Sequence, residues 1–469
     1  MTKKKQTSVG RGIVLVTTVT LSARTSAIVL TLVLIKLLGP DRLGLFLGVQ
    51  SMVLVGCSLC DLGLSQGYRM LVSRDDSLRK HFLGTTLTIQ AIALVLYLLG
   101  LSYYFAVREM LTFSAVLIAL GALVSQWLMM AEVDLKIFRK FNKSNILTVL
   151  PVFGLAGATL LSYLSHDRLY GLAIGYASGM VVTGVVAILF LDPETIQIRF
   201  DRKYLLLIRT SVLFFFSILL YRIGQFWGLS YVLATEGENA AGILGMPLKL
   251  YLTVLIFSTS TTSVTLPVFH KIFQDSAFDQ LSSVLGRLIG ALWAIAGTAT
   301  GLCVLCPKFI VYVLASNEYL DSVPLIPIVG IALLVKTLAV PAGNLLESRK
   351  LQWLRLIGQS ISTSSMVLSV IVLLPKYGII VVPICMLCSD CFLFLWYWIF
   401  NAIGLGRVLP WKVQLRALFA FVLAIWICWI FPGGDIAKAG LFIIIYQLFL
   451  IWFRALQMQE IVTLLRLKR

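Results

Sequence analysis

The most regular feature of this sequence is a series of long apolar runs separated by short polar segments. Runs of at least 20 residues without Asp, Glu, Lys or Arg include 82–107, 110–131, 144–165, 169–191, 288–307 and 356–375. A helix needs about 20 mostly apolar residues to cross a bilayer. With the shorter or once-interrupted runs, the pattern predicts fourteen transmembrane helices, and twelve is the main alternative. The predicted centres lie near residues 25, 52, 93, 121, 155, 180, 219, 254, 297, 335, 366, 391, 425 and 447.

The composition agrees with this pattern. Hydrophobic residues make up 59% of the 469-residue chain and charged residues only 13%, about half of the ~25% share of an ordinary soluble domain. This excludes a soluble enzyme and a disordered chain. The connecting segments are short, so no soluble domain fits between the runs. We therefore expect an all-α polytopic membrane protein.

The net charge of +18 is distributed unevenly along this chain. With fourteen spans and both termini in the cytoplasm, 28 of the 39 Lys and Arg residues fall in cytoplasmic segments and 6 in outer loops. This is the bias that the positive-inside rule describes. The first apolar run is too long for a cleaved signal peptide, so we interpret it as the first span. Topology thus explains the basic charge, and no nucleic-acid partner is expected.

The sequence lacks the motifs of catalysis or of metal binding. It contains no Gly-Lys dipeptide, which excludes a P-loop, and its three histidines fall in three different predicted loops. Cysteines spaced three apart, such as 385, 388 and 391, place small residues on one helix face for close packing. We expect no cofactor, no metal site and no enzymatic activity.

Several charged residues nevertheless lie inside the predicted spans. An ionised group at the centre of a bilayer costs at least ~2.5–3.5 kcal/mol, so each needs a partner or a function. A buried ion pair, for example between Asp390 and Lys336, is the structural interpretation. Arg24 and Arg222 are less easily explained in this way, because embedded cations outnumber embedded anions. We therefore predict a water-filled cavity or an anionic guest, with the candidate residues Arg24, Arg222, Lys249 and Lys336 for binding and Asp61 and Asp390 for ion coupling.

An internal repeat relates two parts of the chain. Arg24 precedes Gly44 by 20 residues, and Arg222 precedes Gly242 by 20 residues, so an offset of 198 superposes both pairs. Repeats of six spans have the same orientation in the membrane and are related by an axis along its normal. We predict two pseudo-symmetric six-helix lobes, residues 1–200 (spans 1–6) and 201–405 (spans 7–12). Residues 406–469 would form two further spans and a cytoplasmic tail. Arg24 and Arg222 would face one another across a central cleft.

Short motifs near these residues resemble a known family. They are LLGPDRLGLF at 37–46, DLGLSQ at 61–66, YRIGQ at 221–225 and KYGII at 376–380. They are similar to motifs of the Wzx-like polysaccharide (O-antigen) flippases of the multidrug/oligosaccharidyl-lipid/polysaccharide exporter superfamily. Many members carry Asp where this chain has Gly224, so the resemblance implies no acidic coupling group at that position.

The resemblance implies a transporter of the bacterial inner membrane that serves the synthesis of O-antigen, capsule or exopolysaccharide. Such a flippase moves an undecaprenyl-pyrophosphate-linked oligosaccharide to the outer face by alternating access. Membrane lipids, a polysaccharide polymerase and chain-length machinery are the further implied partners. A guanidinium suits the pyrophosphate because it binds in a bidentate manner and stays charged.

Two other functions remain open from the sequence. A cation-coupled drug antiporter of the same superfamily would carry more embedded carboxylates. A membrane polysaccharide polymerase or sugar transferase would carry a larger outer loop or an acidic motif at the membrane face.

Overall fold

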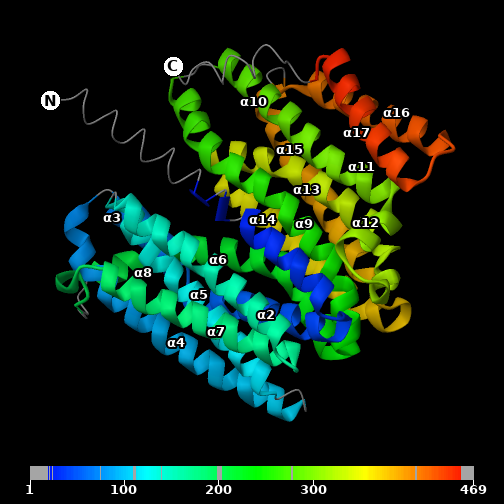
Figure 1. Cartoon of the computed structure of the whole chain (residues 1–469). Helices are drawn as coiled ribbons and strands as arrows, with labels where there is room; N and C mark the ends of the chain where they lie inside the picture. The colour runs from blue at the N-terminus through cyan, green and yellow to red at the C-terminus, as the bar shows by residue number, and fades with distance from the viewer. Residues whose placement is uncertain are drawn as a thin grey trace. The chain divides into compact units, whose positions relative to one another are not determined.

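A computed structural model of the chain divides into two compact units, Met1–Gly242 and Ile243–Arg469 (Figure 1). The structure describes residues 19–20, 22–23, 25–73, 75–108, 112–138, 140–197, 203–275, 278–406 and 409–455. All regular structure in these ranges is helical, which confirms the predicted all-α membrane fold.

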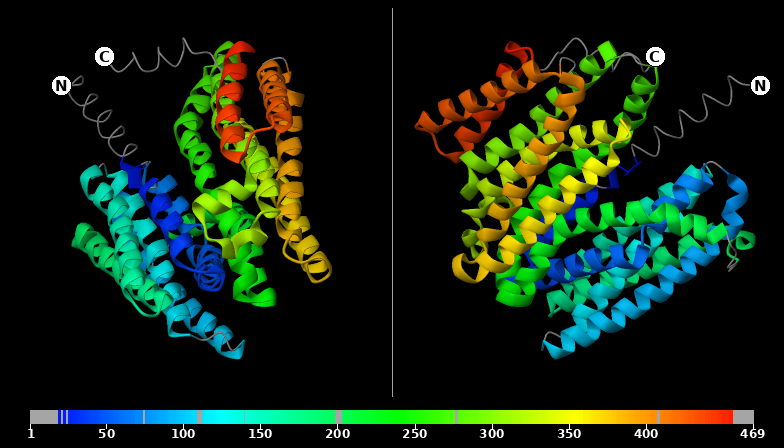
Figure 2. Two further views of the ribbon diagram at one scale, coloured as in Figure 1. Left: turned by 45° about the vertical axis from the view of Figure 1, so that its right-hand side comes forward. Right: turned by 180° about the vertical axis from the view of Figure 1, so that it is seen from behind.

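The first unit is built from long helices joined by short turns (Figures 1 and 2). Its helices are Thr25–Leu37, α2 (Pro40–Asp61), α3 (Leu64–Val72), α4 (Arg79–Val107), α5 (Phe113–Ile137), α6 (Phe141–Leu164), α7 (Arg168–Phe190), α8 (Lys203–Arg222), a π-helical turn (Ile223–Trp227) and the first part of α9 (Gly228–Gln274).

Residues suited to helix N-termini begin several of these helices. Pro40 occupies the first turn of α2, where its missing N–H costs nothing. The Thr112 hydroxyl accepts a bond from the Ala115 N–H at 3.1 Å, and Asp167 accepts one from the Leu169 N–H at 3.0 Å. These caps satisfy backbone donors that have no partner inside the helix.

Small residues let the helices of the first unit pack closely. α6 lies along α7, and a Cβ at Gly179 would lie 2.4 Å from Gly154 Cα. In the same way, a Cβ at Gly63 would lie 2.5 Å from the Ser211 carbonyl oxygen, where α2 and α3 meet α8. Close backbone approach through glycine is the usual way in which membrane helices gain packing contacts.

The two glycines of the sequence repeat meet at one crossing within the first unit. A Cβ at Gly44 would lie 1.8 Å from the Glu238 carbonyl oxygen, and a Cβ at Gly242 would lie 1.9 Å from the Pro40 carbonyl oxygen. The offset of 198 relates Pro40 to Glu238 as it relates Gly44 to Gly242. Each contact is therefore the counterpart of the other, which is the reciprocal pattern that a two-fold relation produces.

In its described residues the second unit contains the rest of α9 and eight further α-helices. These are α10 (Phe278–Leu292), α11 (Thr298–Leu305), α12 (Pro307–Leu314), α13 (Leu325–Ser348), α14 (Gln352–Tyr377), α15 (Val381–Leu405), α16 (Trp411–Ile430) and α17 (Asp435–Trp452). A π-helical turn, Trp293–Gly297, joins α10 to α11. α15 packs against both α13 and α14, and α17 packs on α11 and α16.

Twelve of the described helices are long and apolar enough to cross a membrane, and Thr25–Leu37 is a shorter apolar helix. One of the twelve, Phe214–Ile256, includes both predicted centres 219 and 254. Gly237, with φ 89° and ψ −176°, interrupts its helical geometry. The protein is therefore a multi-pass membrane protein, and the count of fourteen stays a prediction. So do the lobe boundaries at residues 200 and 405.

Candidate functional site

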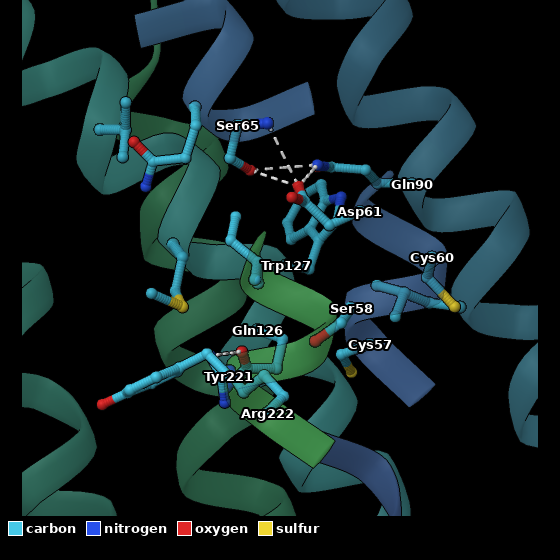
Figure 3. A pocket seen from close by; sticks show the side chains of 15 residues that line it. Cys57, Ser58, Cys60, Asp61, Ser65, Gln90, Gln126, Trp127, Tyr221 and Arg222 are labelled. Atoms are coloured by element: carbon cyan, nitrogen blue, oxygen red, sulfur yellow. Dashed lines mark hydrogen bonds between the residues drawn. The ribbon is translucent and has the colours of Figure 1, made fainter. Parts of the chain in front are cut away.

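A cavity of about 260 Å³ lies inside the first unit (Figure 3). It is lined by the end of α2, the start of α3, the middle of α4, the second half of α5 and the end of α8. Its lining combines one acidic and one basic side chain with amides, hydroxyls and aromatic rings. The lining residues are Cys57, Ser58, Cys60, Asp61, Ser65, Gln66, Gln90, Leu94, Gln126, Trp127, Met129, Val133, Ile218, Tyr221 and Arg222. A concave site with a few converging polar groups is the usual form of a ligand pocket.

Arg222, a residue predicted from the sequence, lies in this cavity at the last position of α8. Its Nη2 donates to Gln126 Oε1 at 3.1 Å, and its guanidinium carbon lies 5.8 Å from the centre of the Phe226 ring. In the described part of the chain no carboxylate forms an ion pair with it. A guanidinium has five N–H donors, so most of its capacity is available to a guest in the cavity.

The backbone changes its winding directly after Arg222. The π-helical turn Ile223–Trp227 inserts extra residues into the helix and contacts α2. Such turns occur frequently at functional sites, because they redirect the side chains that follow. Here the turn brings Phe226 beside the guanidinium.

Asp61 lies in the same cavity, at the last residue of α2. Its Oδ1 accepts three hydrogen bonds: from the Ser65 N–H at 3.2 Å, from Ser65 Oγ at 2.5 Å and from Gln90 Nε2 at 2.6 Å (Figure 3). The chain reverses from α2 into α3 through Leu62 and Gly63, which have φ values of 50° and 72°. This turn brings Ser65 back to the carboxylate.

Lys336 and Asp390 form an ion pair in the second unit, as the structural interpretation predicted. Lys336 Nζ lies 2.7 Å from Asp390 Oδ1, and the side chains are 17% and 3% exposed. The Tyr251 hydroxyl donates to Asp390 Oδ2 at 3.2 Å. The two charges therefore compensate one another inside the unit.

The two remaining candidate residues are Lys249 and Arg24. Lys249 lies partly buried on α9, in the second unit. Arg24 lies outside the described residues. The structure thus brings Arg222 together with Asp61, and Lys336 with Asp390. The predicted meeting of Arg24 with Arg222 stays a prediction.

A charged network near the start of α4 was not predicted. Arg79 binds both carboxylate oxygens of Asp134, with Nε at 2.9 Å and Nη2 at 2.5 Å, and Tyr68 donates to the same carboxylate at 2.5 Å. Arg79 and Lys140 also hold Asp192, at 2.7 Å and 2.6 Å. The hydrogen bond from Lys140, and next that from Arg79, lowers the pKa of Asp192 below its ordinary value. Only the charges are visible in the sequence, because no helical spacing relates residues so far apart.

The neutral residues of the cavity were also missed. Gln90 and Gln126 lie inside charge-free runs. In the sequence they are single polar residues within predicted spans, and nothing there indicates a role in binding. Their contacts with Asp61 and Arg222 appear only when helices α2, α4, α5 and α8 are assembled.

Comparison with solved structures identifies the fold. The chain is similar to a lipid II flippase, MurJ, in an inward closed conformation, with a TM-score of 0.69, 15% identity, and coverage of 94% of this chain and 99% of that one. It is also similar to a multidrug resistance MATE transporter of the MOP superfamily in an inward-facing conformation, with a TM-score of 0.65, 16% identity, and coverage of 84% and 98%.

The chain has the fold of MOP-superfamily transporters. A third match is a MOP-superfamily transporter from Pyrococcus furiosus, with a TM-score of 0.58, 15% identity, and coverage of 84% and 94%. No family model matches the sequence, and no curated protein matches it. At these identities the likeness establishes the MOP-type fold and leaves the substrate open.

Proposed function

We propose that this protein is a transporter, not an enzyme, and that it moves a polyprenyl-pyrophosphate-linked oligosaccharide across the membrane. The observation that carries the proposal is Arg222, which lines a cavity and has no carboxylate partner in the described part of the chain. An unpaired guanidinium inside an apolar bundle is costly unless water or an anion compensates it. A diphosphate is such an anion.

The neighbouring residues suit the sugar part of the same guest. Trp127 and Tyr221 supply aromatic surface to the cavity, and Gln66 supplies an amide. Aromatic side chains combine a large apolar contact with a polar edge, and amides both donate and accept hydrogen bonds. A headgroup that carries both a diphosphate and sugars matches this lining. Its polyprenyl tail would stay in the lipid.

Transport would follow alternating access between the two faces of the membrane. The sequence repeat supports such a motion, because transporters built from repeats expose one site to each side in turn. The chain has no P-loop, so an ion gradient or removal of the product would set the direction. The polysaccharide polymerase and chain-length machinery are proposed partners on the product side.

The test compares surface polysaccharide in cells that carry Arg222→Ala, Arg222→Lys or Arg108→Ala. Arg108 is an exposed arginine at the end of α4 and serves as the control. We expect Arg222→Ala to reduce export at least about tenfold, the effect of losing ~1.4 kcal/mol of binding, at an unchanged membrane level. Arg222→Lys should recover part of it, because it keeps the charge but not the bidentate geometry. Normal export by Arg222→Ala would refute the proposal.

A cation-coupled antiporter for small molecules is the second candidate. The observation in its favour is Asp61, a carboxylate in the same cavity that lacks an ion-pair partner in the described ranges. A dye-efflux assay separates the two functions. Efflux of a cationic dye that depends on Asp61 and is insensitive to Arg222→Ala would favour the antiporter.

A further inference from the structure

The guanidinium of Arg222 is held by contacts from two elements at one end of the cavity. Gln126 Oε1, on α5, accepts a hydrogen bond from Arg222 Nη2 at 3.1 Å (Figure 3). The Phe226 ring, on the π-helical turn, lies 5.8 Å from the guanidinium carbon. Together these contacts restrict the orientation of a side chain that is otherwise long and flexible.

Helix α5 supports Gln126 firmly. The indole N–H of the next residue, Trp127, donates to the Leu87 carbonyl oxygen on α4 at 3.2 Å. Gly121 lets α5 approach α7 closely, because a Cβ there would lie 2.7 Å from the Tyr176 ring. The amide of Gln126 is therefore presented from a helix that is fixed on both sides, which a residue needs if it is to position another.

The important property of Gln126 is that it is a neutral acceptor. A guanidinium has donors only, so the atom that faces it must be the amide oxygen. This bond orients the guanidinium and leaves its positive charge uncancelled, whereas a carboxylate at the same position would form an ion pair with it. Asp61, the acidic residue of the lining, accepts its hydrogen bonds from Ser65 and Gln90. Within the described ranges it forms no ion pair with Arg222.

The amide nitrogen of Gln126 adds further donors at this end of the cavity. Among the described residues Nε2 has no hydrogen-bond partner, so its two hydrogens are available beside those of the guanidinium. Donors on both side chains suit a guest that is rich in acceptor oxygens, such as a diphosphate.

We propose that Gln126 sets the charge selectivity of the cavity. It acts through Arg222 as a positioning residue: it orients the guanidinium without neutralising it, so the cavity prefers an anionic headgroup to a neutral or cationic one. A carboxylate in its place would both neutralise the arginine and repel an anion. This inference rests on the proposed function and names the residue on which the preference for a diphosphate depends.

The experiment measures thermal unfolding of the purified full-length protein in detergent, with farnesyl diphosphate as the probe. A ligand that binds the folded state raises Tm in a saturable manner. Farnesol tests the apolar tail alone, and inorganic pyrophosphate tests the headgroup alone. We expect a saturable rise with farnesyl diphosphate, a weaker one with pyrophosphate and none with farnesol.

Two variants separate the charge at position 126 from its hydrogen bond. Gln126→Glu should raise the midpoint for farnesyl diphosphate at least about tenfold, the result of losing ~1.4 kcal/mol of binding, because its carboxylate neutralises Arg222. Without the probe its Tm should equal or exceed that of wild type, since the guanidinium gains an ion-pair partner. Gln126→Leu removes the positioning bond but adds no charge, so its midpoint should lie between those of wild type and Gln126→Glu. Gln352→Glu makes the same change at an exposed residue at the start of α14 and should leave the midpoint unchanged.

The inference is overturned if the midpoint of Gln126→Glu matches wild type or lies below that of Gln126→Leu. It is also overturned if Gln126→Glu fails to fold, because a carboxylate at this distance from an uncompensated guanidinium should pair with it. Arg222→Ala distinguishes these failures from failure of the proposed function. If wild type does not respond to farnesyl diphosphate, or if Arg222→Ala responds as wild type does, the proposed function loses its site. If Arg222→Ala abolishes the response and Gln126→Glu preserves it, only the role of Gln126 is lost.

Discussion

The Lys336–Asp390 pair allows a direct test of whether these two embedded charges neutralise one another in the second unit. Replacing Lys336 with Met keeps a long, flexible side chain and removes the ammonium group. The charged atoms lie 2.7 Å apart, where Coulomb's law gives an attraction of about 6 kcal/mol at an effective dielectric constant of about 20. The variant would leave Asp390, which is 3% exposed, with Tyr251 as its donor.

We expect Lys336→Met to lower the free energy of unfolding by about 3–5 kcal/mol, because breaking a buried pair strands the remaining charge. Asp390→Asn should have a similar effect, since it strands the ammonium. The double variant Lys336→Met/Asp390→Asn should recover most of this loss, because no unpaired charge remains. The measurement is thermal unfolding in detergent for all four proteins, which gives the coupling energy as a double-mutant cycle.

The same variants decide whether Lys336 also binds the guest. If the lysine is structural, the double variant regains export together with stability. If it contacts the headgroup, the double variant is stable but fails in export. Single effects that are small and simply additive would refute the assignment of a buried ion pair.

Three further predictions follow from other contacts. Gly44→Ala should cost about 1–3 kcal/mol through overpacking, because its Cβ would lie 1.8 Å from the Glu238 carbonyl oxygen; unfolding and membrane levels test this. Asp192→Asn should destabilise at pH 7. The pKa of Asp192 is lowered by the hydrogen bond from Lys140, so its contribution is complete above about pH 4 and disappears as the pH falls through its folded pKa. The difference in Tm from wild type should then vanish at low pH. Tyr446→Phe should cost about 1–3 kcal/mol, because its hydroxyl donates to the Trp293 carbonyl at 2.9 Å, and denaturant unfolding measures the loss.

Hydropathy predicted the helices because the requirement of a bilayer is local. Each backbone group must be satisfied within its own helix, so an apolar run of sufficient length specifies a span by itself. The number of spans is ambiguous where an apolar stretch is long enough for more than one helix. Gly237 interrupts a helical stretch that is continuous in composition, and the sequence does not say whether one span or two results.

The partners of charged residues could not be predicted in the same way. Arg79 counts toward topology in the sequence, but it binds Asp134, 55 residues away, in a bidentate pair. Lys140 likewise binds Asp192, 52 residues away. Neither separation along the sequence follows from the period of a helix or a strand. These pairs therefore become visible only when the helices are assembled. The Asp390–Lys336 pair was predicted from the sequence, because the predicted spans contain few acidic residues that could serve as partners.

These ion pairs indicate which of the embedded cations remain candidates for binding a ligand. In the second unit, Lys336 has the compensation that its burial requires, and it needs no ligand to explain its presence. In the described part of the first unit, Arg222 and Asp61 lie in one cavity and each lacks an ion-pair partner. A buried guanidinium without a carboxylate partner is costly unless water or an anion compensates it. Arg222, and not the paired Lys336, is therefore the embedded cation that an anionic guest would compensate.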